Sequence, residues 1–236
     1  MPTRAVALNE RTDHAKKIVA LLRLHYPHSG AFLDYTTPIE LLVATMLSAQ
    51  CTDKKVNEVT KPLFKKYRSA HDFACAQQTA LEQEVHQTGF FRMKAKNIIA
   101  AAQRLCSVYD GTVPATMEAL VSLPGVARKT ANIVLSGAFN KAEGIAVDVH
   151  VKRLAGRLGL SSQSNTDKIE QDLMSLLPRQ DWIDFNHLLV DHGRAVCIAR
   201  KPRCAVCVLR HICPSACVLE NQGRSKDERP LSKKKL

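Results

Sequence analysis

Leucine and alanine recur at helical spacing along almost the whole chain, and this pattern restricts the fold more than any other feature of the sequence. Valine, isoleucine and threonine do not gather into the alternating runs that half-buried strands need. With 45% apolar residues, the 236-residue chain can bury a substantial core in one large domain or in two small ones. The sequence therefore predicts an all-α protein.

Capping and turn residues divide this pattern into separate helices. Thr37-Pro38-Ile39-Glu40 fits a capping box with proline at the first helical position. The helix that it opens runs through Leu47, is apolar nearly all round and is predicted to lie in a core; the polar segment 48–50 follows it. Glycines 89, 111, 159 and 193 lie where other helices are predicted to end. The remaining helices are predicted over 13–25, 53–67, 79–87, 92–108, 116–122, 128–139, 148–158, 166–177 and 181–192.

The eight cysteines fall into two groups. Three of them are scattered and are predicted to be small buried hydrophobic residues: Cys51, Cys75 and Cys106. The others crowd near the C-terminus, where the spacing Cys-x6-Cys-x2-Cys-x5-Cys lets four thiolates converge on one metal centre: Cys197, Cys204, Cys207 and Cys213, with Cys217 outside the pattern. Zinc commonly binds four cysteines, but the irregular spacing and the lack of a second Cys-x2-Cys pair favour a larger iron–sulfur cluster. Zinc, and cysteines unrelated to any metal, remain the alternatives.

The formal charge of +12 indicates a polyanionic partner, and nucleic acid is the usual one. Between Asp191 and Glu220 the chain has five basic residues and no acidic ones: Arg194, Arg200, Lys201, Arg203 and Arg210. A metal that fixes the loop between the first two cysteines would present its cations to a phosphate backbone. The lysines at 233–235 are predicted to belong to a disordered tail. No apolar stretch is long enough to span a membrane and no secretory signal is visible, so a cytoplasmic protein is expected.

A second motif lies at residues 120–132, Leu-Val-Ser-Leu-Pro-Gly-Val-Ala-Arg-Lys-Thr-Ala-Asn. A short amphipathic helix ends at Leu123, and a longer one begins near Arg128. Gly125 permits a positive φ and a close approach to the backbone, and the start of the second helix offers N–H groups and the positive end of its dipole. The motif is therefore a candidate phosphate site, with an ordinary turn between helices as the alternative.

This motif resembles the helix–hairpin–helix of the endonuclease III family. It is followed by Ala146-Val147-Asp148-Val149-His150-Val151-Lys152-Arg153, which is similar to the aspartate segment of that family, and then by four cysteines at the spacing of the family's cluster. The resemblance covers about residues 13–214 and involves three motifs in the same order.

The resemblance implies two all-α domains with DNA in the cleft between them. Residues 31–141 would form a six-helix, barrel-like domain that contains the hairpin at about 116–139. Residues 1–30 and 142–236 would form the iron–sulfur domain, with a [4Fe–4S] cluster held by the loop 197–213 and a disordered tail at about 218–236. The implied partner is double-stranded DNA with damaged bases or abasic sites, bound by a monomer in the bacterial cytoplasm.

The implied activity is that of a bifunctional DNA glycosylase and AP lyase acting on oxidised pyrimidines. In this family a lysine at the position of Lys129 attacks the sugar C1′, the base leaves, a Schiff base forms, and β-elimination cuts the strand on the 3′ side. The helix dipole and Arg128 both favour the unprotonated amine that such an attack needs. Asp148 resembles the catalytic aspartate, which stabilises positive charge at the sugar, and the residue also fits a helix N-cap.

The expected DNA contacts come from three parts of the chain. Gln50 is the expected wedge that fills the gap left by an extruded nucleotide. The loop at 89–92, with Phe90 and Phe91, matches a family loop beside the opposite strand, where the aromatic rings either insert or pack. The full set of expected DNA-binding residues is Gln50, Gly125, Ala127, Arg128, Thr130, His150, Arg200, Lys201 and Arg203, with a helix-face or core role as the alternative for His150 and for Arg153.

Two other functions fit parts of the sequence. Adenine and mismatched-thymine glycosylases share the scaffold but generally lack a lysine at the position of Lys129, and an adenine glycosylase is expected to carry a further C-terminal domain. A non-catalytic DNA-binding module fixed by zinc would explain the charge and the cysteines alone. Ala127 departs from the second glycine of many relatives, and it would be strained only if its backbone needs a positive φ.

Overall fold

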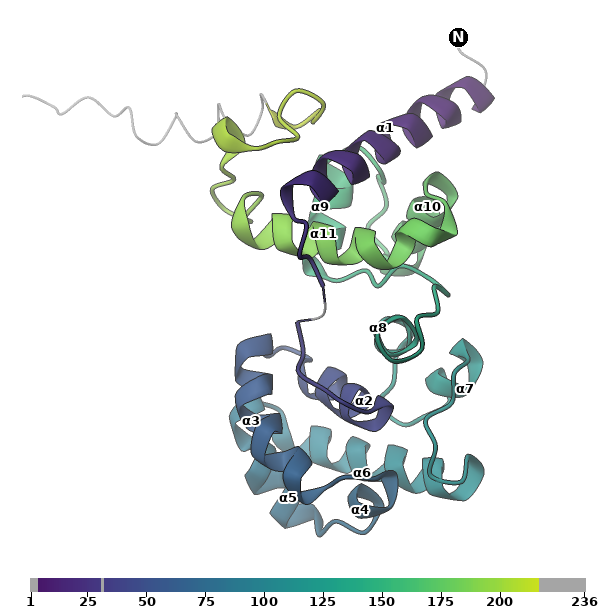
Figure 1. Ribbon diagram of the computed structural model, residues 1–236, viewed down its shortest axis with the longest axis vertical. Coiled ribbons are helices and arrows are strands. Elements are labelled where there is room, and N and C mark those ends of the chain that lie inside the picture. Colours follow the sequence, from purple (N-terminus) through teal and green to yellow (C-terminus); the bar gives the residue numbers. More distant parts are fainter. Residues whose placement is uncertain (1–3, 31, 217–236) are drawn as a thin grey trace, which may run out of the picture. The chain divides into compact units, whose positions relative to one another are not determined.

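The structure is a computed structural model that describes residues 4–30 and 32–216 (Figure 1). Within these residues the regular elements are helices and no strand is present, which confirms the predicted all-α class. The α-helices are α1 (Arg4–His25), α2 (Pro38–Leu47), α3 (Asp53–Lys66), α4 (Ala70–Ala74), α5 (Gln78–Val85), α6 (Phe91–Val108), α7 (Met117–Val121), α8 (Arg128–Phe139), α9 (Val149–Arg157), α10 (Thr166–Leu176) and α11 (Trp182–Ala195). Three short 3-10 turns, η1 (His86–Thr88), η2 (Arg179–Asp181) and η3 (Cys204–Val206), complete them.

The chain divides into two compact units. The central unit comprises residues 31–146 and holds α2 to α8, and the terminal unit combines residues 1–30 with residues 147–236. The terminal unit is therefore discontinuous, because α1 packs with helices from the other end of the chain (Figure 1).

The core of the central unit is built around α2. Its N-terminus has the predicted capping box, in which the Thr37 side chain accepts a hydrogen bond from the Glu40 N–H and the Glu40 carboxylate accepts one from the Thr37 N–H. Every residue from Ile39 to Leu47 is buried, as the all-round apolar pattern predicted. α2 packs against α8, while α4 and α5 pack against α6.

Gly137 allows α8 to approach α2 closely. A Cβ atom at this position would lie 2.7 Å from Leu41 Cδ2 and 3.1 Å from the Tyr35 hydroxyl oxygen. The Tyr35 hydroxyl donates a hydrogen bond of 2.8 Å to the Gly137 carbonyl. This contact fixes α8, which begins at the hairpin motif, on the core of its unit.

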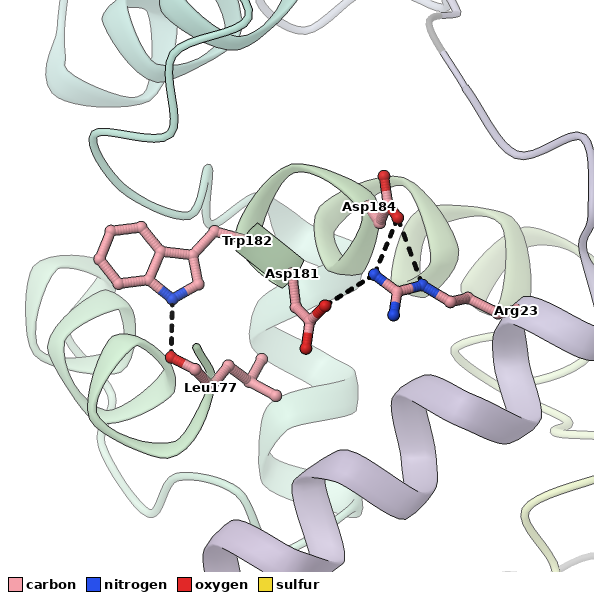
Figure 2. Close-up of polar contacts among 5 residues, drawn as sticks. All are labelled: Arg23, Leu177, Asp181, Trp182 and Asp184. Carbon is pink, nitrogen blue, oxygen red and sulfur yellow. Dashed lines mark hydrogen bonds and ion pairs between the residues drawn. The ribbon is translucent and has the colours of Figure 1, made fainter. Parts of the chain in front are cut away.

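In the terminal unit, α1 packs on α10 and α11, and α11 packs on α9. The Arg23 guanidinium of α1 donates hydrogen bonds to Asp181 Oδ1 at 2.8 Å and to Asp184 Oδ2 at 2.9 Å (Figure 2). Asp181 is buried, so the arginine balances a carboxylate that has left water. Next to this pair, the Trp182 indole N–H donates to the Leu177 carbonyl at 3.0 Å (Figure 2). Both contacts fix the start of α11, and the arginine also joins it to α1.

Three expectations about the helices differ from the structure. α1 begins at Arg4 rather than at residue 13, since no glycine or proline interrupts residues 4–13. The sequence prediction missed α4, which is too short to show a period but has a capping box formed by Ser69 and Asp72. Gly193 lies inside α11 rather than at its end.

The three scattered cysteines are not core residues, contrary to the prediction. Cys75 is exposed because it caps the C-terminal end of the short helix α4, and Cys51 and Cys106 are half-buried at the edge of the core. The expectations for Cys217 and for the tail at 218–236 lie outside the described residues.

Candidate functional site

The hairpin motif folds as two helices joined by a tight turn. α7 ends at Val121 and α8 begins at Arg128, and the turn between them buries Leu123 and Val126. Gly125 has a φ of 76°, and a Cβ atom added there would lie 2.8 Å from the Asn97 side chain of α6. The turn therefore requires glycine for its backbone conformation and also for its close packing.

Ala127 causes no strain in this turn. It is the N-cap residue of α8 and has φ −89° and ψ 167°, an extended conformation that alanine adopts freely. Its side chain forms no capping hydrogen bond, and the first turn of any helix presents N–H groups without intrahelical partners. The hairpin therefore keeps the features of an anion site despite its departure from glycine.

Lys129 lies in the first turn of α8. Its side chain is exposed, as is that of Arg128, and Thr130 is half-buried beside them. Two cations and the positive end of the helix dipole thus lie together on one exposed surface of the central unit.

A hollow of about 230 Å³ on the central unit brings together segments that are distant in sequence. It lies between the end of α2, the start of α6 and the hairpin turn. Its lining includes the expected wedge Gln50, the exposed ring of Phe90 and the glycine of the hairpin: Met46, Ala49, Gln50, Phe90, Met93, Lys94, Asn97 and Gly125.

Gln50 and Phe90 share an unusual backbone conformation. Their φ values are 53° and 49°, in the left-handed region that residues other than glycine rarely adopt. Phe90 is 66% exposed, whereas Phe91 is half-buried and its ring contacts the His86 ring with centroids 4.5 Å apart. Of the two predicted roles for these aromatic residues, packing applies to Phe91, while Phe90 projects toward solvent.

In the terminal unit, Asp148 is the N-cap residue of α9. Its Oδ1 atom accepts hydrogen bonds of 2.8 Å from the backbone N–H groups of His150 and Val151. The predicted cap is therefore present, and it holds the half-buried carboxylate in one orientation.

His150 is half-buried against α11. Burial lowers the pKa of His150 below its ordinary value, an effect that nearby Asp148 opposes and Arg153 reinforces. A Cβ atom at Gly193 would lie 2.9 Å from His150 Nδ1 and 3.0 Å from an Arg153 guanidinium nitrogen. The missing side chain of Gly193 therefore makes room for the first two turns of α9.

Two arginines of α9 hold the beginning of the cysteine-rich loop. Arg153 donates hydrogen bonds to the carbonyls of Gly193 at 3.0 Å and Cys197 at 3.1 Å. Arg157 donates to the carbonyls of Ile198 at 2.9 Å and Ala199 at 2.7 Å, and to Cys197 Sγ at 3.3 Å. Arg153 thus has the structural role that the sequence left open, and Arg157 was missed. The four-residue spacing of these arginines on α9 was the available signal.

The four C-terminal cysteines line one cavity, together with Arg157, His192 and apolar side chains. Burial raises the pKa of Cys207, and the thiols of Cys197, Cys204 and Cys213 raise it further, so the four sulfur atoms act on one another. Burial also raises the pKa of Cys213. Four thiols gathered in one cavity are the ligand set that an iron–sulfur cluster takes.

A buried histidine lies beside this cavity. His192 of α11 is 1% exposed, and its Nε2 atom is 3.3 Å from Cys207 Sγ. Its Nδ1 atom is 3.0 Å from the Tyr26 hydroxyl oxygen. This chain of polar contacts joins the residue after α1 to a cysteine of the loop, and the sequence alone gave no signal for it.

The basic residues of the loop are presented to solvent. Arg200, Lys201 and Arg203 are exposed, as are Arg194 and Arg210. The carbonyls of residues 197–199 accept the arginine hydrogen bonds described above, so the loop backbone is held from the inside while its cations face outward.

Comparisons with known proteins identify the family. A family model described as "HhH-GPD superfamily base excision DNA repair protein" matches residues 43–179, and one described as "Iron-sulfur binding domain of endonuclease III" matches residues 197–213. Endonuclease III of Synechocystis sp. is 51% identical over 206 residues, which cover 87% of this chain and 94% of the relative. Endonuclease III of Bacillus subtilis is 41% identical over 210 residues, covering 89% of this chain and 92% of the relative.

A solved structure described as a trapped endonuclease III-DNA covalent intermediate, an estranged-adenine complex, has a TM-score of 0.84. It is 38% identical, and the match covers 88% of this chain and 97% of that chain. A thermostable thymine-DNA glycosylase, 23% identical with a TM-score of 0.79, shares the fold. None of the described helices is long and apolar enough to cross a lipid bilayer. The second family model confirms the iron–sulfur interpretation of the cysteines over the zinc alternative.

With two family models and relatives of 51% and 41% identity in agreement, the chain belongs to the endonuclease III family, the DNA glycosylases and AP lyases of base excision repair.

Proposed function

We propose that Lys129 is the nucleophile of this enzyme and that its substrates are oxidised pyrimidines and abasic sites in double-stranded DNA. The observation that supports this most directly is an exposed lysine in the first turn of α8, at the N-terminus of the second hairpin helix. The amine would attack the sugar C1′ as the damaged base leaves, form a Schiff base, and cut the strand on the 3′ side by β-elimination.

Lys129 lies among positive charges and is open to solvent. Its exposed side chain lies beside Arg128 at the positive end of the α8 dipole, so a phosphate of bound DNA would be attracted to the same place. The hairpin turn around Gly125 would bind the phosphate backbone next to it.

Asp148 is proposed as the second catalytic residue. Both of its capping hydrogen bonds go to Oδ1, which leaves the carboxylate rigidly held but able to interact through Oδ2. It would stabilise positive charge that develops at the sugar and help to move the proton of the lysine. A capping carboxylate suits this role because its orientation does not have to be created when the substrate binds.

Cys197, Cys204, Cys207 and Cys213 are proposed as the cluster ligands. When bound, the iron–sulfur cluster links the four thiolates and so fixes the loop on which Arg200, Lys201 and Arg203 are exposed. These three cations would contact phosphates and supply affinity that depends on salt. Gln50 is proposed as the wedge and His150 as a further DNA contact, and the bacterial cytoplasm is the proposed location.

Borohydride trapping on a duplex with a single thymine glycol tests the nucleophile. The wild-type protein should form a covalent adduct, and Lys129→Ala should form none. Lys129→Arg is the matched control, because it keeps the positive charge but cannot form a Schiff base, so it should bind DNA without trapping. Lys168→Ala, an exposed lysine of α10, should trap like the wild type.

Two outcomes of the trapping experiment would contradict the assignment of Lys129. An adduct that persists in Lys129→Ala would assign the reaction to another amine. DNA binding without any adduct, in the wild-type protein as well, would favour the monofunctional alternative on the same scaffold.

A further inference from the structure

The central unit contains a buried lysine that the proposed chemistry does not use. Lys94, in the first turns of α6, is 6% exposed. Its Nζ atom donates hydrogen bonds of 2.8 Å to the Leu47 carbonyl and of 2.7 Å to the Thr88 carbonyl. Burying an amine is unfavourable unless its N–H groups find acceptors, and here they find two.

The two acceptors belong to different loops. Leu47 is the last residue of α2, three residues before Gln50, and Thr88 is the last residue of η1, two residues before Phe90. Each loop therefore leads directly to an exposed side chain beside the hollow of the central unit, and Lys94 itself lines that hollow.

Both loop tips have a conformation that the surrounding structure must support. The left-handed φ values of Gln50 and Phe90 are unfavourable for residues with a Cβ atom. Phe90 is held from the other side as well, since its carbonyl accepts a hydrogen bond of 3.1 Å from the Lys94 N–H. Lys94 thus contacts the Phe90 loop with its backbone and its side chain, and the Gln50 loop with its side chain.

We propose that Lys94 is a positioning residue that fixes the distance between the Gln50 and Phe90 loops, so that both tips are ready to enter the opened DNA duplex. Without this link, the strained tips would relax to other conformations. The free-energy cost of ordering them would then fall on the step that opens the DNA, and opening would be less favourable. The inference rests on the proposed function only in assuming that the protein opens damaged DNA.

The two hydrogen bonds from the Lys94 side chain can form whether its amine is protonated or neutral. Burial lowers the pKa of Lys94 below its ordinary value, but a neutral amine still has two N–H donors for the two carbonyls. Methionine at this position would have a similar length and would fill the space without any donor. Lys94→Met therefore removes the link more than the packing.

The test measures DNA opening without base removal. The duplex carries 2-aminopurine opposite a tetrahydrofuran abasic analogue, which cannot form a Schiff base, and the fluorescence increase on protein binding reports the unstacked base. Because Lys129 chemistry plays no part, a failure of the proposed nucleophile and a failure of this inference give different results. Lys96→Met, an exposed lysine two residues along α6, is the matched control.

We expect Lys94→Met to retain binding to the duplex but to lose about tenfold in the opening equilibrium, the equivalent of about 1.4 kcal/mol. Lys96→Met should behave like the wild type. Combining Lys94→Met with Gln50→Ala should cost less than the sum of the two single losses, because part of the effect of Lys94 acts through the Gln50 loop. If Lys94→Met does not fold, Lys94→Gln, which keeps two N–H donors at shorter reach, should show a smaller loss of the same kind.

Three results would overturn the proposal. One is normal opening by Lys94→Met. Another is a loss of DNA opening in Gly111→Ala that equals the loss in Lys94→Met when the two variants have the same thermal stability. Gly111→Ala weakens the central unit away from both loops. The third is an additive loss in the double variant with Gln50→Ala.

Discussion

Gly125→Ala should destabilise the central unit for two separable reasons. The φ of 76° would place an alanine in the left-handed region, which costs about 1–2 kcal/mol. The new Cβ atom would also lie 2.8 Å from Cβ of Asn97, an atom that cannot rotate away, and overpacking of this kind costs about 1–3 kcal/mol. The expected loss in the free energy of unfolding is therefore about 2–5 kcal/mol.

Gly111→Ala is the matched control, because it measures the cost of placing alanine at a positive φ without the added steric contact. Gly111 lies in the same unit and has a φ of 73°, but a Cβ atom there would meet nothing within 4 Å. Its substitution should cost only the conformational share, about 1–2 kcal/mol. The difference between the two variants measures the contact with Asn97.

Urea unfolding followed by far-ultraviolet circular dichroism measures both variants. With an m-value of about 2 kcal/mol/M, the midpoint should fall by roughly 1–2.5 M in Gly125→Ala and by roughly 0.5–1 M in Gly111→Ala. The single tryptophan, Trp182, lies in the terminal unit, so its fluorescence shows whether that unit keeps its own transition. Equal shifts in the two variants would refute the argument from close packing, and no shift in either would refute the argument from φ.

Three further predictions concern the terminal unit. Arg157→Met removes the hydrogen bonds to the loop carbonyls and to Cys197 Sγ. The visible absorption of the bound cluster should therefore decay faster under a chelator in Arg157→Met than in the control Lys152→Met. Equal decay in the two variants would contradict the role of Arg157. Arg200→Ala should reduce the slope of log K against log salt by about 0.9 if one phosphate contact is lost, and an unchanged slope in DNA-binding titrations would exclude that contact. Burial lowers the pKa of His187, so between the folded value and the unfolded value of about 6.5 only the unfolded chain binds the proton. The free energy of unfolding should therefore fall as the pH falls through this window, and His187→Gln should show a smaller fall; an identical pH dependence would remove His187 as a cause.

Local signals in the sequence predicted much of the fold correctly. The capping box at Thr37 and Glu40 and the N-cap at Asp148 are satisfied within three residues of the chain, so their patterns are visible without any tertiary information. The bounds of α8 match the prediction because the turn at Gly125 fixes where the helix starts. α4 was missed because a helix of five residues has too few positions for a period.

Contacts between distant segments explain the errors and the omissions. Gly193 resembled a helix end, since glycine commonly stops helices, but its function is to make room for His150 and Arg153, which lie about forty residues earlier in the chain. Arg157 resembled an ordinary exposed arginine, yet its partners are the carbonyls that begin the cysteine-rich loop. The sequence around Gly193 does not show which residues it makes room for, and the spacing of Arg153 and Arg157 indicates a shared helix face but not the loop that they contact.

Lys94 shows why such roles matter for function. In sequence it is one of two lysines on an amphipathic helix, and the other, Lys96, is exposed as that pattern suggests. The burial of Lys94 depends on two carbonyls that the chain ends of α2 and η1 turn inward, 47 and 6 residues away. Those carbonyls in turn lie beside Gln50 and Phe90, the residues with left-handed backbones. The exposed tips that resemblance associates with DNA therefore depend on an interior amine, and substitutions that spare every DNA contact can still impair DNA opening.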